Sequence, residues 1–284
     1  MSVLHEMLSS VEQAEPRSVT TMRPSMDKDG VVFELPDELV KDYYDLKEYL
    51  RIATQQEDVR VLSIANSLSG EGSSSIATYL AFLMTGARTR PMGKVTQKKF
   101  GDSKNWQKLH ANDNPWSNVS GVPSSVLLVD ANLHSPSLNR FFGVSAQPGL
   151  ADILEGKAVL EEAVHSIRGT NFMLLCAGRT AANPAELISN DYFNSLVKEW
   201  RQQFQYVIFD SPAVLKSAEA MSLAACVDGV VLVVRAGHTR WDSAQNAKRR
   251  LITARSNVLG VTLNRRKMEI SDGLFKSFVE TSND

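Results

Sequence analysis

Short apolar runs alternate along the chain with segments in which apolar residues recur every three or four positions. The runs have the length of β-strands, and the segments between them have the period of α-helices. Near-continuous apolar strands separated by helices are typical of a parallel sheet covered on both faces. The pattern therefore predicts an α/β fold with a doubly wound, mostly parallel sheet and helices on both faces. The predicted strands comprise residues 59–65, 125–131, 172–178, 206–212, 229–237 and 258–265.

The chain before the first predicted strand has two parts. Residues 1–35 are polar and show no sustained period, so we interpret them as a mobile N-terminal tether. From Pro36 the apolar positions follow a helical period, which predicts an amphipathic helix at the start of an ordered domain. We expect this domain to span residues 36–270 and a tail to follow over residues 271–284.

A long polar segment at about residues 88–123 is predicted to be an insertion in this domain. It is rich in lysine and arginine and contains Trp106 and Trp116. Basic residues interleaved with tryptophan favour docking onto an anionic membrane surface or a partner protein. A solvated loop is the alternative, because long insertions in surface loops cost little free energy.

Composition narrows the classes of partner. The 284 residues carry a net charge of -1, which gives no general attraction to nucleic acid or anionic lipid. Cys176 and Cys226 lie in apolar runs without a C-x-x-C spacing, so we expect reduced thiols and a cytoplasmic protein. We find neither a signal-peptide pattern nor an apolar run of about 20 residues, the length of a membrane span. Membrane contact at the inner face is therefore expected only through a partner or the basic insertion.

Candidate chemistry begins at "SLSGEGSSSIATYLA", residues 67–81, where a glycine-rich turn opens a helix directly after a strand. Gly70 and Gly72 allow positive φ angles and let main-chain amides approach a phosphate at the helix N-terminus. An ordinary glycine-rich turn is the alternative. Two further predicted strands end in Asp130 and Asp210 at the same edge, where a carboxylate needs water, a metal or a hydrogen-bond donor.

Six further segments occur in the order "VLLVDANLHSP", "GLADILEG", "NPAELI", "YVIFDSPAVL", "DGVVLVVRAGHT" and "LGVTLNRR". With these motifs, the chain from about Asp42 to Arg266 resembles the bacterial tyrosine kinases of capsule and exopolysaccharide assembly. Those kinases are cytoplasmic P-loop proteins related to the MinD and ParA ATPases. The resemblance implies that ATP or ADP and Mg²⁺ are the ligands, and no other cofactor is expected.

The resemblance also implies roles for individual residues. Asp130 and Asp210 correspond to the residual catalytic carboxylates, and together with Ser74 they correspond to the ligands of Mg²⁺. The implied nucleotide-binding residues are Gly70, Glu71, Gly72, Ser73, Ser74, Ser75, Asn264 and Arg265.

The chain departs from the family pattern where the chemistry lies. Ser73 stands where the family has the lysine that reaches the β and γ phosphates, which predicts weaker nucleotide binding and still weaker transfer. Asn132 and His134 replace an aspartate and an arginine of the second aspartate motif, and residues 268–284 contain no tyrosine. Lys216, in the loop after Asp210, is a candidate to replace the missing cation.

These features leave different functions open. The first is a catalytically impaired, kinase-like partner of a membrane polysaccharide co-polymerase of the chain-length regulator type, which acts in exopolysaccharide or capsule biosynthesis and export and can self-associate. The second is an active protein-tyrosine autokinase or ATPase with a non-standard cation. A ParA-like ATPase is the third, and it needs the same phosphate lysine. No nucleic-acid partner is expected.

Overall fold

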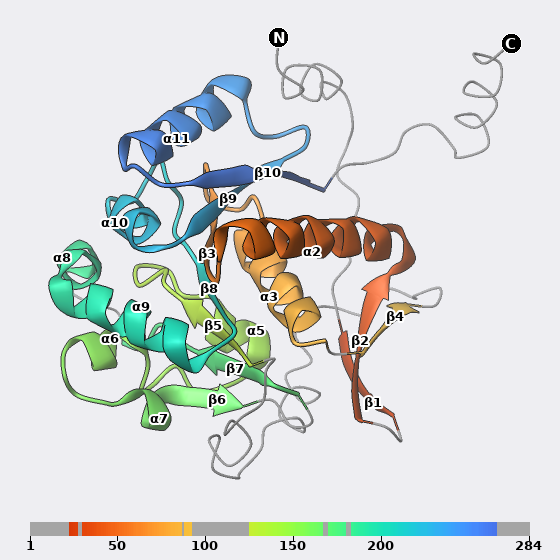
Figure 1. The fold of residues 1–284 in the computed structure, drawn as a ribbon, viewed down its shortest axis with the longest axis horizontal. Coiled ribbons are helices and arrows are strands. Elements are labelled where there is room, and N and C mark those ends of the chain that lie inside the picture. The colour runs from red at the N-terminus through yellow and green to blue at the C-terminus, as the bar shows by residue number, and fades with distance from the viewer. Residues whose placement is uncertain are drawn as a thin grey trace, which may run out of the picture.

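The computed structural model describes residues 23–27, 30–86, 88–92, 125–166, 170–179 and 183–265. Its main body is a seven-stranded sheet with the strand order β10-β9-β3-β8-β5-β7-β6 (Figure 1). All neighbouring strands are parallel except the short edge strand β6, which is antiparallel to β7. The strands are β3 (Val61–Asn66), β5 (Val126–Asp130), β6 (Val164–Ser166), β7 (Phe172–Leu175), β8 (Tyr206–Asp210), β9 (Gly229–Arg235) and β10 (Val258–Asn264).

Helices cover both faces of this sheet, as the sequence predicts (Figure 1). Alternate residues of each strand face opposite sides: Ile208 packs with the residues of α2, α3 and α5, whereas Phe209 packs with those of α6 to α9. On that second side α10 and α11 cover β9. The helices are α2 (Asp37–Glu57), α3 (Ser73–Met84), α5 (Leu138–Phe142), α6 (Leu150–Leu154), α7 (Leu160–Ala163), α8 (Pro184–Ser189), α9 (Asp191–Gln203), α10 (Glu219–Cys226) and α11 (Trp241–Thr253).

The predicted strands and the amphipathic helix are confirmed, whereas a second, three-stranded sheet differs from the sequence interpretation. It contains β1 (Arg23–Asp27), β2 (Gly30–Pro36) and β4 (Arg88–Met92). Part of the predicted tether thus pairs with the start of the predicted insertion. The run "VVFEL" in β2 is rich in residues that favour strands. Its pairing with β4 is not predicted, because the two strands are distant in sequence and local patterns do not relate them.

Several predictions about chain segments lie outside the described residues. These segments include residues 1–22 of the tether, both tryptophans of the insertion and the tail over 271–284. Both cysteines are free thiols, as expected. Within the described ranges every helix is too short or too polar to span a lipid bilayer.

Candidate nucleotide-binding site

The turn between β3 and α3 has the shape that its two glycines allow. Gly70 and Gly72 have φ angles of +88° and +97°, in the left-handed region that side chains disfavour. A Cβ atom on Gly72 would lie 2.2 Å from Nδ2 of Asn264, whereas one on Gly70 would meet no atom within 4 Å. Gly72 is therefore required both by its conformation and by a close neighbour.

The Glu71 side chain holds this turn from inside. It is fully buried, and its carboxyl group accepts hydrogen bonds from the main-chain amides of Ser67 and Leu68 at 2.7 and 3.0 Å. The Ser67 hydroxyl donates to it at 2.7 Å, and the Thr239 hydroxyl donates a further bond from beyond β9. Glu71 is among the predicted nucleotide-binding residues, but its carboxyl group points into the protein and fixes the shape of the loop.

Asn264, at the end of β10, holds the same turn from the other side. Its Nδ2 donates to the main-chain oxygen of Glu71 at 2.8 Å, and its Oδ1 accepts from the Arg265 amide at 2.9 Å. Arg265 is exposed, and partial burial together with the charge of Arg235 lowers its pKa. The structure thus brings Asn264, one of the implied nucleotide-binding residues, to the glycine-rich turn that begins at Ser67, the candidate phosphate loop.

The two predicted carboxylates are register partners on adjacent strands, β5 and β8, but their surroundings differ. Asp130 is buried and accepts from the main-chain amides of Asn132, Ser137 and Leu138 at 3.2, 2.9 and 3.0 Å. Burial raises its pKa, and these hydrogen bonds act against the rise. The main-chain amides of the loop after β5 therefore already use much of the hydrogen-bonding capacity of the Asp130 carboxyl oxygens.

Asp210 is buried without such compensation. Neither of its carboxyl oxygens has a hydrogen-bond partner within the described part of the chain. Burial, followed by the charge of Asp130, raises its pKa to about 8, although the nearby Ser73 and Ser74 hydroxyls act against this rise. The carboxyl group of Asp210 therefore favours its protonated, neutral form, and a cation bound beside it would favour the charged form.

The predicted metal ligands fit a single Mg²⁺ only in part. Ser74, at the start of α3, accepts a hydrogen bond from the Ser137 hydroxyl at 3.2 Å, and with Asp210 it offers the oxygen ligands that Mg²⁺ prefers. The described residues include no group of three or more His, Cys, Asp or Glu side chains suited to a metal ion. Water or nucleotide oxygens would have to complete the coordination.

Ser73, which stands at the lysine position of the family motif, is the first residue of α3 and is buried. Lys216 is exposed in the loop after β8. His134, which stands at the arginine position of the motif, lies with Nε2 3.2 Å from Oε1 of Glu219, a residue that is only 2% exposed. This contact joins positions far apart in the chain, so no local pattern in the sequence predicts it.

Comparison with known proteins bears directly on the family. The chain is 36% identical over 143 residues to the tyrosine-protein kinase YwqD of Bacillus subtilis, a match that covers 50% of the chain and 60% of YwqD. It is 29% identical over 140 residues to the tyrosine-protein kinase CpsD of Streptococcus agalactiae, which covers 49% of the chain and 61% of CpsD. The chain is a homologue of the bacterial tyrosine-protein kinases. It spans about 60% of the length of these two relatives, and no model of a known protein family matches it.

Solved structures agree with this relationship. The kinase domain of VpsO aligns with a TM-score of 0.59 and 27% identity over 81% of this chain and 93% of that one. MinD of Pyrococcus furiosus aligns with a TM-score of 0.50 and 20% identity over 78% of this chain and 79% of that one, which shows a shared fold. The predicted similarity to bacterial tyrosine kinases and the P-loop type of α/β fold are therefore confirmed, whereas the roles of individual site residues stay predictions.

Alanine substitutions separate the two constraints on Gly72. Gly70→Ala should lower the free energy of unfolding by about 1 to 2 kcal/mol through its positive φ alone. Gly72→Ala should lower it by about 1 kcal/mol more, because the new Cβ displaces the Asn264 amide from Glu71. Urea unfolding measures both, and the extra loss should disappear when each variant is remade in an Asn264→Ala background. Equal losses in the natural background would contradict the assignment.

The raised pKa of Asp210 predicts a stability that depends on pH. The folded chain retains a proton that the unfolded chain releases above about pH 4, so stability falls as the pH rises from 4 towards 8. In metal-free buffer, Asp210→Asn should flatten this fall, which at its steepest is about 1.4 kcal/mol per pH unit. Urea unfolding at several pH values checks this, with the exposed Asp191→Asn as the control. Parallel curves for the natural chain and Asp210→Asn would rule out the raised pKa.

Proposed function

We propose that this chain is a cytoplasmic, kinase-like regulatory protein of exopolysaccharide or capsule biosynthesis and that it is impaired in phosphoryl transfer. The observation that carries the proposal is a phosphate loop that keeps its shape through Glu71 and Asn264 while a buried serine, Ser73, occupies the lysine position. A loop held by protein contacts needs neither nucleotide nor lysine to remain folded.

The missing lysine affects binding and transfer to different degrees. A charge-assisted hydrogen bond contributes about 1.5 to 3 kcal/mol, and one donor placed for the transition state is worth about a hundred- to a thousandfold in rate. The loop amides and the N-terminus of the 12-residue helix α3 can still attract a phosphate. Mg²⁺, when bound, would neutralise phosphate charge beside Ser74 and Asp210. Weak binding with little transfer is therefore the expected combination.

A membrane polysaccharide co-polymerase is the partner that this proposal implies. The support is the resemblance to the kinases of capsule assembly, together with the similarity to tyrosine-protein kinases such as CapB of Staphylococcus aureus, which is 25% identical over 154 residues. A regulatory partner acts through its surfaces, so it can keep this role after its transfer chemistry has weakened.

An active tyrosine autokinase is the second candidate function. The unpartnered carboxyl oxygens of Asp210 beside Ser73 and Ser74 favour it, because they would suit a metal-bound nucleotide. This candidate function needs a cation to replace the lysine, and the sequence indicates Lys216 for that role.

Calorimetry with Mg-ATP and Mg-ADP distinguishes the two candidates. The natural chain should bind at least about tenfold more weakly than Ser73→Lys, since the restored charged hydrogen bond contributes about 1.5 kcal/mol or more. Ser195→Lys, on the exposed surface of α9, adds the same charge away from the site and should bind like the natural chain. Equal affinity of the natural chain and Ser73→Lys, together with tyrosine phosphorylation by the natural chain that Lys216→Ala abolishes, would overturn the proposal in favour of the second candidate.

A further inference from the structure

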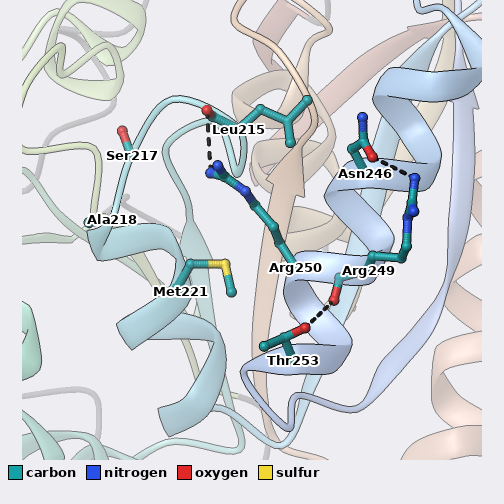
Figure 2. A pocket seen from close by; sticks show the side chains of 8 residues that line it. All are labelled: Leu215, Ser217, Ala218, Met221, Asn246, Arg249, Arg250 and Thr253. Atoms are coloured by element: carbon teal, nitrogen blue, oxygen red, sulfur yellow. Dashed lines mark hydrogen bonds between the residues drawn. The ribbon is translucent and has the colours of Figure 1, made fainter.

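A groove of about 690 Å³ runs between α10 and α11, apart from the phosphate loop (Figure 2). One wall is apolar and contains Leu215, from the loop after β8, and Met221 of α10. The other wall is α11, whose Asn246, Arg249 and Arg250 line the groove; Arg250 extends towards Leu215, whereas Arg249 lies beside Asn246. None of the described residues that line the groove is acidic.

The two arginines differ in how they are held. Arg249 is exposed and donates to Oδ1 of Asn246 at 2.6 Å, so its guanidinium group stays at the rim. Arg250 reaches across the groove and donates to the main-chain oxygens of Val214 and Leu215 at 3.2 and 3.4 Å, as Figure 2 shows for Leu215. An open groove with apolar residues on one side and guanidinium groups on the other suits a segment that combines acidic and apolar side chains.

We infer that residues 268–284 of this same chain occupy the groove. These residues lie outside the described part, but their sequence has the required chemistry: four acidic residues and one lysine give a net charge of -3. Leu274, Phe275 and Phe278 have the spacing of one helix face and supply apolar anchors for the wall formed by Leu215 and Met221.

The place where the described chain ends, at Arg265, supports docking of the segment within the same molecule. Asn264 contacts Glu71, and the Leu215 amide donates to the Ser67 oxygen at 3.2 Å, so β10 and the loop beside the groove meet at the same turn. The 17 residues of the segment, if fully extended, would reach about 55 Å, which is several times the width of a helix and is enough to enter the groove. A tethered segment also has a millimolar effective concentration, which a partner protein rarely matches.

A short series of hydrogen bonds connects the groove to the phosphate loop, so a segment bound in the groove would affect the loop. Arg250 binds the carbonyl groups of Val214 and Leu215, and the amides of these two residues bind the main-chain oxygens of Asn66 and Ser67. Ser67 in turn donates to Glu71. The segment over 268–284 therefore acts as an internal regulator of the loop, whether or not the loop binds nucleotide with useful affinity.

Hydrogen exchange on the full chain, read by mass spectrometry without nucleotide, tests this inference. Amides of residues 268–284 should exchange at least about tenfold more slowly than in an unfolded chain. Arg249→Glu should remove this protection, because it reverses the charge at the rim. Lys198→Glu, an equal change of charge on the exposed surface of α9, should preserve it. Phe275→Ser with Phe278→Ser leaves the groove intact and should also abolish protection.

Three results would overturn the inference. Exchange at the unfolded rate in the natural chain would show that the segment does not dock. Protection that survives Arg249→Glu in a variant with an unchanged unfolding midpoint would place the segment elsewhere. Protection that rises with protein concentration would mean that a second copy supplies the segment. Each outcome is independent of nucleotide affinity, so the proposed function can fail or stand separately.

Discussion

A carboxyl group that is fully buried must find hydrogen-bond donors inside the protein, and the Glu71 side chain finds them in Ser67, Leu68 and Thr239. These donors belong to the start of the phosphate loop and to the turn after β9, so one side chain joins segments that are distant in sequence. The contact fixes the turn in which Gly70 and Gly72 take positive φ angles. The path of the loop therefore depends on protein contacts alone.

This arrangement explains how a homologue of the tyrosine-protein kinases can retain a phosphate loop without its lysine. In the family motif the lysine binds the phosphates of the ligand, whereas Glu71 and Asn264 form hydrogen bonds that hold the loop itself. The proposed function follows from this division, because loss of the lysine would weaken interactions with phosphate while the contacts of Glu71 and Asn264 keep the loop folded. The buried carboxyl group of Asp210 is the part of the site that favours its neutral form, and neither of its oxygens has a hydrogen-bond partner among the described residues. In both respects the shape of the site is better preserved than its charges.

The parts of the structure that sequence could predict are those set by local pattern. The apolar runs locate β3, β5, β7, β8, β9 and β10, and the glycine-rich turn locates the loop at their carboxyl edge. The pairing of β2 with β4 was missed because the two strands lie far apart in the sequence, outside any local window. The inward direction of the Glu71 side chain and the contact of His134 with Glu219 were missed for the same reason.

The groove between α10 and α11 also depends on residues brought together by the fold. Arg250 and Leu215 belong to separate elements, and only their packing reveals the bridge from α11 to the loop after β8. The sequence indicated a kinase-like core, and the structure adds a groove whose Arg250 is linked by main-chain hydrogen bonds of Val214 and Leu215 to the start of the phosphate loop.

The free energy of unfolding of Glu71→Ala in nucleotide-free buffer tests the central claim most directly. Loss of the carboxyl group leaves several buried donors unsatisfied, so we expect a decrease on the order of 3 kcal/mol, with the exposed Glu161→Ala close to the natural chain. Hydrogen exchange at residues 67–72 should accelerate in the same variant. If Glu71→Ala were as stable as the natural chain, the loop would not depend on this contact, and the account would be wrong.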